Sequence, residues 1–346
     1  MPLPSTASQI KGKIILINLG IIGTGWISDS FVDACIRTGS YRVYAICSRN
    51  VKQAEAFGVK YGAEFFYDDI RELAGCDGVD AVYIATPNAL HYEQCLAALR
   101  AGKHAIVEKP AFSNVAQAQT AFATARKNGV LLLEAIRSIH EANHRIVKEA
   151  IARIGPICGV NLVFMKRSPR YDMVLAGDEP GIFSLRLSGG ALMDLGVYLI
   201  YDAVDWFGTP ESAVYYCQKA HTGADTGGVA VLRYPGFDAE LSFSKICNSR
   251  MVNEIRSRDY AILVDPAQNI RSVRWTDNDK NETELAQPPK EHWMEDEAQC
   301  FARLIAGECV QTPYESLCKL SLDVHALMTE IRLGAGIVFP ADAHIS

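Results

Sequence analysis

A glycine-rich turn near the start of the sequence has the residue types and spacing of a pyrophosphate-binding site. Residues 20–28 read Gly-Ile-Ile-Gly-Thr-Gly-Trp-Ile-Ser and follow an apolar, strand-like run. In such a turn the first glycine makes the tight bend and the second lets the backbone approach the pyrophosphate, whose charge meets the free N–H groups of the following helix. Ser28 occupies the third position, where Gly or Ala is usual. An ordinary β–α turn sometimes reads Gly-x-Gly, but this one opens the first helix. It predicts a dinucleotide site at Gly23, Thr24, Gly25, Trp26 and Ile27.

The residues after the second expected strand indicate which nucleotide binds. An Asp or Glu about 20 residues beyond the turn would hold the adenosine ribose hydroxyls. The sequence instead has Cys47-Ser48-Arg49-Asn50, with Lys52 close by. Ser48, Arg49 and Lys52 offer a hydroxyl and two cations to a ribose 2′-phosphate. The cofactor is therefore predicted to be NADP(H), with NAD as the alternative if Arg49 is only a solvated surface charge.

A scaffold of the α/β class is expected to position these residues. From about residue 13 to 134, short apolar runs alternate with amphipathic stretches of helical length, which is typical of parallel βαβ units. We expect strands at 14–22, 42–47, 81–85, 105–107 and 130–133, and helices at 28–38, 52–61, 91–101 and 115–128. The sequence thus predicts an NAD(P)-binding Rossmann domain, a doubly wound parallel sheet, over residues 10–135.

After residue 134 the pattern predicts a second, α+β domain over residues 136–346. Strand-like stretches at 159–166, 213–219, 228–234, 239–247 and 261–264 are expected to form a largely antiparallel open sheet. Helices are expected at 141–154, 191–207, 291–306 and 317–333, and a polar surface loop at 276–290. An open sheet face needs a cover, so we expect this domain to bind substrate and to form a homo-oligomer, either a dimer or a tetramer.

The composition is that of an ordinary globular protein and argues against several other classes. The 346 residues are 49% hydrophobic and 21% charged, with a net charge of -6 and no long Lys/Arg cluster, so we expect no nucleic-acid partner. The apolar run at 14–22 is about half the length of a membrane span, so no membrane partner is expected either. Ten cysteines contain no Cys-x-x-Cys pair, which favours reduced thiols in a cytoplasmic protein. Residues 1–9 are expected to be a loose leader.

Two histidines four residues apart could ligate a metal, but no third ligand is placed to complete the site. His140 and His144 would share one face of a helix. We expect a structural or substrate-lining role for them and no metal site. Lys166, Arg167, Arg170 and Tyr171 follow the first strand of the second domain, where a loop could offer donors to a polyhydroxylated substrate.

Several further motifs follow one another along the chain. They are Thr86-Pro87-Asn88 followed by His91, Ala101-Gly102-Lys103-His104, Glu108-Lys109-Pro110, and residues 189–198, Gly-Gly-Ala-Leu-Met-Asp-Leu-Gly-Val-Tyr. In this order and spacing they resemble the motifs of the glucose-fructose oxidoreductase / inositol dehydrogenase (Gfo/Idh/MocA) family. The resemblance is strong over residues 19–110 and 189–198 and thin after about residue 252, where Arg256-Ser257-Arg258-Asp259 replaces a glycine-rich turn of the family.

The resemblance implies a role for each of these segments. The nicotinamide would lie beside Thr86, Pro87 and Asn88, with His91 lining the cofactor side, and Glu108-Lys109-Pro110 would form the floor of the site. Lys109 would be the catalytic lysine. The last motif has Asp194, three residues and then Tyr198, as in the glucose-fructose oxidoreductase and dimeric dihydrodiol dehydrogenase branches, whereas the inositol dehydrogenase branch usually has His at the second position.

The chemistry of alcohol oxidation suits these residue types. Asp194 and Tyr198 are four apart on an expected helix, so both side chains would emerge on one face. Tyr198 is the candidate proton donor and acceptor, but the ordinary tyrosine pKa of about 10 is too high for efficient work near neutrality. The ammonium of Lys109 would lower that pKa, whereas Asp194 would raise it, so we assign Asp194 an orienting role.

The sequence therefore predicts an NADP(H)-dependent oxidoreductase that moves hydride between nicotinamide and a secondary alcohol or ketone of a sugar, polyol or cyclic diol. Two alternatives stay open at this point. The cofactor could remain bound and cycle, as in glucose-fructose oxidoreductase or the nicotinamide-dependent glycosidases. The chain could also be a cofactor-sensing regulator without catalysis. Taken singly, Lys109 could be a surface lysine, Asp194 a solvated carboxylate and Tyr198 a half-buried aromatic.

Overall fold

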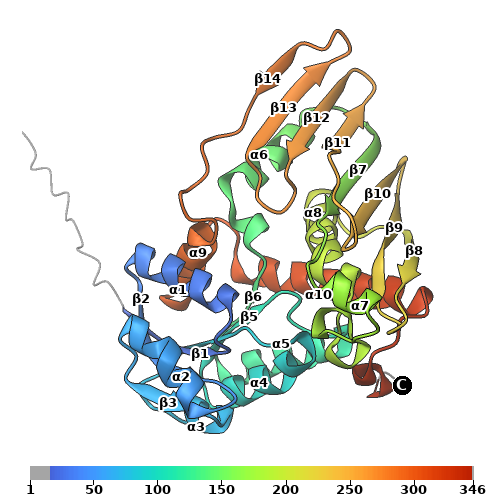
Figure 1. Ribbon diagram of the computed structural model, residues 1–346. Helices are drawn as coiled ribbons and strands as arrows, with labels where there is room; N and C mark the ends of the chain where they lie inside the picture. The colour runs from blue at the N-terminus through green and yellow to red at the C-terminus, as the bar shows by residue number, and fades with distance from the viewer. Residues whose placement is uncertain (1–15, 345–346) are drawn as a thin grey trace, which may run out of the picture.

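A computed structural model describes residues 16–344, which form two β-sheets with helices packed against them (Figure 1). The expected leader at 1–9, the expected domain start at residue 10 and the first residues of the strand expected at 14–22 lie outside the described residues. The two sheets stand at opposite ends of the molecule, and the long helix α10 (Tyr314–Gly334) runs between them (Figure 1).

The first sheet is the predicted doubly wound parallel sheet. It has six strands in the order β3-β2-β1-β4-β5-β6, and all of its pairs are parallel. The order reverses between β1 and β4, so the carboxyl ends of these two strands flank the crevice where such sheets bind ligands. The elements are β1 (Ile17–Ile22), α1 (Trp26–Thr38), β2 (Tyr41–Cys47), α2 (Val51–Gly58), β3 (Phe65–Tyr67), α3 (Ile70–Ala74), β4 (Ala81–Ile84), α4 (Asn88–Arg100), β5 (His104–Glu108), α5 (Val115–Asn128) and β6 (Leu132–Ala135).

Helices cover both faces of this sheet, which explains why its strands are almost continuously apolar. Buried residues of α1 and α2 join one face of the sheet in a single cluster, and those of α3, α4 and α5 join the other. Helix α9 (Glu295–Ile305), from near the end of the chain, packs against α1 in the first of these clusters. Residues after Ala135 thus contribute to the core of the first domain as well as to that of the second.

Strand β3 and helix α3 were not predicted from the sequence, because three and five residues are too few to show a hydrophobic period.

The second sheet has eight strands in the order β14-β13-β12-β11-β7-β10-β9-β8. All its pairs are antiparallel except β7 with β10, which confirms the expected largely antiparallel sheet. The segment at 276–290 is not simply a loop, since it contains β14. The elements are α6 (Ala142–Ile151), β7 (Ile157–Met165), α7 (Tyr171–Leu175), α8 (Val197–Phe207), β8 (Ser212–Lys219), β9 (Asp225–Tyr234), β10 (Phe237–Ser244), β11 (Asn253–Ser257), β12 (Tyr260–Asp265), β13 (Ser272–Asp277) and β14 (Glu282–Glu284).

The helix expected at 191–207 is built in two parts. Residues Leu192–Gly196 form a π-helical turn, and the α-helix α8 begins only at Val197. The stretch Leu185–Phe207 is long and apolar enough to cross a membrane, but 89% of its most apolar window is buried in the protein. It is therefore the core helix of the second domain, packed with α6 and α10 against one face of the sheet.

A buried carboxylate at the end of β6 joins the two domains. Glu134 accepts hydrogen bonds from the backbone N–H of Ala111 (2.9 Å) and the hydroxyls of Tyr201 (2.6 Å) and Ser321, and it lies 3.1 Å from Nε2 of His325. Tyr201 belongs to α8, and Ser321 and His325 belong to α10. Burial alone would raise the pKa of Glu134, but its partners outweigh burial and lower the pKa to about 2.

We expect Glu134→Gln to lower the free energy of unfolding by about 3 kcal/mol at neutral pH, because removing one partner leaves the other buried polar groups unpaired. A carboxylate whose folded pKa is about 2 stabilises the fold above its ordinary pKa of 4.5, and that stability is lost as the pH falls toward 2. The difference between wild type and variant should therefore shrink between pH 5 and pH 2.5, as measured by denaturant unfolding.

The matched control is Glu64→Gln, which removes an exposed ion pair with Arg42 and should cost under about 1 kcal/mol. A Glu134→Gln penalty as small as that of the control, or one independent of pH, would contradict this account of the junction.

Candidate active site

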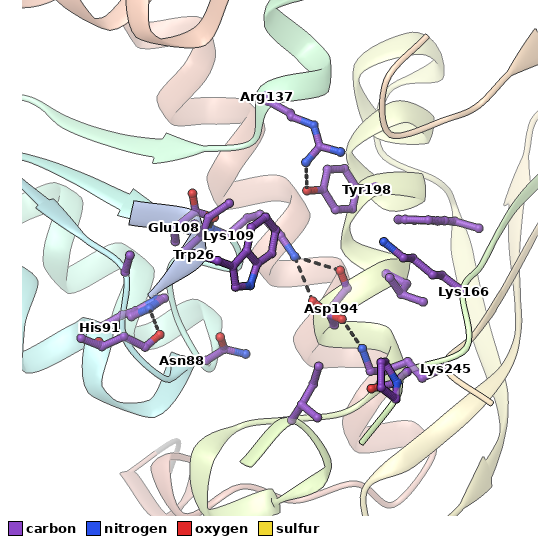
Figure 2. A pocket seen from close by; sticks show the side chains of 18 of the residues that line it. Trp26, Asn88, His91, Glu108, Lys109, Arg137, Lys166, Asp194, Tyr198 and Lys245 are labelled. Atoms are coloured by element: carbon purple, nitrogen blue, oxygen red, sulfur yellow. Dashed lines mark hydrogen bonds and ion pairs between the residues drawn. The ribbon is translucent and has the colours of Figure 1, made fainter. Parts of the chain in front are cut away.

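A cavity of about 410 Å³ lies between the two domains, at the carboxyl ends of the first sheet's strands. Trp26, Ile27, Thr86, Asn88, His91, Glu108 and Lys109 reach it from the first domain, and Asp194 and Tyr198 reach it from the second (Figure 2). The structure therefore brings the predicted nicotinamide-side residues and the three predicted catalytic residues to one cavity. Pro87 is the exception: it is exposed, is the N-cap residue before α4, and does not line the cavity.

The turn after β1 has the backbone that a pyrophosphate requires. Gly23 has a φ of 98°, and a Cβ there would lie 2.2 Å from the carbonyl oxygen of Ala85, so only glycine fits. Gly25 is the N-cap of α1, no side chain caps the helix, and a Cβ would meet nothing within 4 Å. An uncapped helix N-terminus facing open space can accept an anion. Ser28, at the third position of the motif, is completely buried, so a small side chain is needed there for α1 to pack closely on the sheet.

The residues expected to select the nucleotide lie at the end of β2 and the start of α2. The Ser48 hydroxyl is 3.4 Å from that of Thr24 and donates to Oε1 of Gln53 at 3.2 Å. Arg49 and Lys52 are exposed, and neither forms an ion pair with any residue in the range 16–344. Their positive charges therefore remain available to an anion on the adenosine side of the turn.

His91 connects the loops that follow β4 and β5. Its Nε2 lies 2.8 Å from the carbonyl oxygen of Thr86, and its Nδ1 lies 3.2 Å from that of Pro110. The ring is 1% exposed, and burial lowers its pKa in spite of these carbonyls. His91 thus positions the two loops that border the cavity, as well as lining it.

Glu108 lies under the cavity at the end of β5. It accepts a hydrogen bond from the Tyr83 hydroxyl at 2.7 Å and another from the backbone N–H of Lys109 at 3.2 Å. Burial raises the pKa of Glu108. The side chain is held in place from below and forms the floor of the cavity. Asn88, at its rim, donates from Nδ2 to the carbonyl oxygen of Ser188 in the second domain at 2.9 Å.

Lys109 and Asp194 form an ion pair across the domain boundary. Nζ of Lys109 donates to Oδ1 and to the backbone oxygen of Asp194, both at 3.0 Å. A second lysine, Lys245, donates to Oδ2 of the same carboxylate (Figure 2). Burial opposes the charged form of each group, but the two ammonium groups hold the pKa of Asp194 far below its ordinary value, and Asp194 raises the pKa of Lys109.

The phenol of Tyr198 faces two cations. Its ring centroid lies 4.9 Å from Nζ of Lys109, and its Oη accepts a hydrogen bond from Nη1 of Arg137 at 2.7 Å. The expected lowering of the Tyr198 pKa by Lys109 is present, and Arg137 adds to it, but burial outweighs both, so the pKa lies above its ordinary value. The expectation of a net lowered pKa is therefore wrong, because the side chain is only 5% exposed.

Two important side chains of the site were not predicted. Arg137 lies in a short 3₁₀ turn (Arg137–His140) after β6, and its guanidinium also stacks 4.4 Å from the ring centroid of Trp293. Lys245 follows β10 directly. Both follow strands at the end nearest the cavity, and that position is the only signal the sequence contains for them.

The other polar residues noted in the sequence divide into two groups. Lys166 and Arg167 line the cavity, whereas Arg170 and Tyr171 do not. His144 lies 3.4 Å from Oδ1 of Asp202 and 3.7 Å from Oδ2 of Asp205, and burial lowers the pKa of His140 to about 3. Within residues 16–344 no cluster of three His, Cys, Asp or Glu side chains could hold a metal ion.

Comparisons with known proteins agree with this geometry. An oxidoreductase family described as having an NAD-binding Rossmann fold matches residues 17–135, and the GFO/IDH/MocA C-terminal domain matches residues 144–259. The scyllo-inositol 2-dehydrogenase (NADP(+)) IolU of Bacillus subtilis is 35% identical to this chain over 94% of it and 99% of IolU. The uncharacterized oxidoreductase YgjR of Escherichia coli is 32% identical over 95% and 99% of the two chains.

Comparison with solved structures finds the same two-domain fold in a related enzyme. A 3-ketoreductase from Actinomadura kijaniata in complex with NADP superposes with a TM-score of 0.77 and 27% identity, covering 92% of this chain and 97% of the other. Fold, site and relatives together define the class: this is an NAD(P)-dependent oxidoreductase that acts on CH–OH groups. More narrowly, the chain belongs to the Gfo/Idh/MocA family, which confirms the resemblance found in the sequence.

Proposed function

We propose that this protein is an NADP(H)-dependent dehydrogenase for a secondary alcohol or ketone of a sugar, polyol or cyclic diol. Tyr198 would be the proton donor and acceptor. The observation that carries the proposal is the contact of the buried Tyr198 hydroxyl with Arg137, beside the ammonium of Lys109, in a cavity bordered by the dinucleotide turn.

The chain's own groups handle the proton, while the bound nicotinamide supplies or accepts the hydride. During reduction, Oη of Tyr198 gives its proton to the carbonyl oxygen of the substrate as hydride reaches the carbonyl carbon. Lys109 polarises the same oxygen, and Lys109 and Arg137 stabilise the tyrosinate until water returns a proton. Oxidation follows these steps in reverse. Since the pKa of Tyr198 is raised by burial, the phenol is protonated near neutrality and ready for the reductive direction.

Asp194 orients the ammonium of Lys109 and does not transfer the proton. Its pKa is held very low by Lys109 and Lys245, so it stays ionised at neutral pH and has no proton to give. A carboxylate fixed between two lysines restricts where each ammonium can lie, which is the positioning that catalysis requires.

Relatives support the choice of substrate class and cofactor. Their names include scyllo-inositol 2-dehydrogenase (NADP(+)) from Bacillus subtilis, D-xylose 1-dehydrogenase (NADP(+)) from Haloferax volcanii, and trans-1,2-dihydrobenzene-1,2-diol dehydrogenase from Sus scrofa. All three names describe oxidation of a hydroxyl on a polyol, sugar or cyclic diol. Arg49 and Lys52 are exposed beside Ser48 and have no ion-pair partner within residues 16–344, which favours NADP(H) over NAD(H).

We also propose a cytoplasmic homo-oligomer. All ten cysteines are free thiols, which suits a reducing compartment. Apolar side chains remain exposed on the second sheet, with Val214 41%, Tyr216 68% and Tyr260 42% exposed, and a second copy of the chain would cover them.

Tyr198→Phe should lower kcat for NADPH-dependent ketone reduction by about 100-fold or more, because the proton donor is lost while the ring and its packing remain. The measurement is absorbance of the nicotinamide during turnover of the best substrate from a screen of inososes, ketoses and cyclic diols. Tyr216→Phe, an exposed tyrosine on β8, is the matched control. Turnover by Tyr198→Phe within a few-fold of wild type would disprove this assignment.

Arg49→Ala should weaken NADPH binding by about 10-fold or more and leave NADH binding unchanged, because a charge-assisted hydrogen bond to the 2′-phosphate is lost. Fluorescence titration of the protein with each nucleotide measures both constants. Lys127→Ala, an exposed lysine at the end of α5, is the control. An equal affinity of wild type for NADPH and NADH would contradict the role given to Arg49.

A further inference from the structure

Cationic side chains outnumber carboxylates around the cavity. Its lining contains Lys109, Arg137, Lys166, Arg167 and Lys245, against Glu108 and Asp194. A neutral polyol would need hydroxyl-binding donors and acceptors in balance, so this excess of positive charge requires another explanation.

Lys166 and Lys245 are adjacent at the ends of two neighbouring strands. In the parallel pair β7 and β10, Met165 is in register with Ser244, and Lys166 and Lys245 are the next residues. The chains stay paired there, because the N–H of Lys166 donates to Ser244 and that of Ser168 donates to Lys245. Residues side by side on paired strands point the same way, and like charges in such a position repel. Both side chains lie on the second-domain side of the cavity (Figure 2).

Within the described part of the chain no carboxylate pairs with Lys166, whereas the charges of Glu108, Glu141 and Glu297 act on Arg137. Lys109 and Lys245 share the single carboxylate of Asp194, and Arg167 pairs with Asp172 at 2.6 Å. Among the residues from 16 to 344, neither Lys166 nor Arg137 has a carboxylate within ion-pair distance. The Lys245 side chain is only 4% exposed, so water screens the positive charge of its ammonium poorly.

We propose that the substrate carries an anionic oxygen group, which Lys166 binds directly with Lys245 behind it, while the reacting carbon lies at Tyr198. The proposal rests on the proposed function and narrows its substrate class from neutral polyols to hydroxylated acids. Lys166 is a specificity-determining residue in this account. Sugar acids and sugar phosphates share the required chemistry. The cavity of about 410 Å³, part of which the nicotinamide would fill, suits an acid of hexose size.

The test is calorimetric titration of the protein–NADP⁺ complex with three compounds that share one carbon chain: glucitol, gluconate and glucitol 6-phosphate. Gluconate, the phosphate or both should bind at least 10-fold more tightly than glucitol at low salt, with the difference decreasing as ionic strength rises. Comparison of the two anions identifies carboxylate or phosphate as the group that binds.

Lys166→Met should remove most of that preference by weakening the anionic compounds far more than glucitol. Lys127→Met is the control and should retain the preference. Equal binding of neutral and anionic compounds, no binding of either anion, or equal weakening of all three by Lys166→Met would overturn the proposal. Binding is measured without turnover, so failure of the dehydrogenase proposal would appear separately, as absence of NADP⁺ reduction or ketone reduction with every compound screened.

Discussion

Asp194 carries one negative charge between two ammonium groups, and the geometry of the whole site depends on that arrangement. Lys109 follows β5 in the first domain, Lys245 follows β10 in the second, and Asp194 lies in the π-helical turn before α8. Taking such charges out of water is costly unless each finds a partner. The attraction between them outweighs that cost, keeps the carboxylate ionised and raises the pKa of Lys109. The ammonium is thereby fixed beside the ring of Tyr198.

The position of Tyr198 follows from the same turn. A π-helical turn inserts extra backbone before α8, so Asp194 and Tyr198 do not have the simple one-turn spacing of a regular helix. Lys109 nevertheless contacts both residues, the carboxylate through hydrogen bonds and the phenol through its ring face. Arg137, in the turn that follows β6, then donates a hydrogen bond to the phenolic oxygen. In the proposed mechanism, these two cations stabilise the tyrosinate of the buried phenol.

Much of the first domain could be predicted from the sequence, because its signals are local. Gly23 has a backbone requirement that only glycine meets, and the buried parallel strands have continuous apolar runs. Residues such as Lys109 and Tyr198 could be assigned only through the family motifs. Arg137 and Lys245 were missed because their meaning depends on contacts with Tyr198 and Asp194, which are distant in sequence. Strands β11, β13 and β14 were missed because polar and charged residues interrupt their apolar pattern.

The most direct test of the central interaction is the protonation state of Lys109. Wild-type protein and Asp194→Asn would be acetylated with a small active ester at pH 8, and the rate at Lys109 followed by peptide mass spectrometry, with the exposed Lys52 as internal control. Without the carboxylate, burial still opposes the charged form of Lys109 and the strongest of its opposing partners is gone, so its pKa should fall. The account predicts that Lys109 is acetylated at least 10-fold faster in the variant while Lys52 is unchanged. An unchanged rate at Lys109 would contradict the claim that Asp194 keeps this lysine charged.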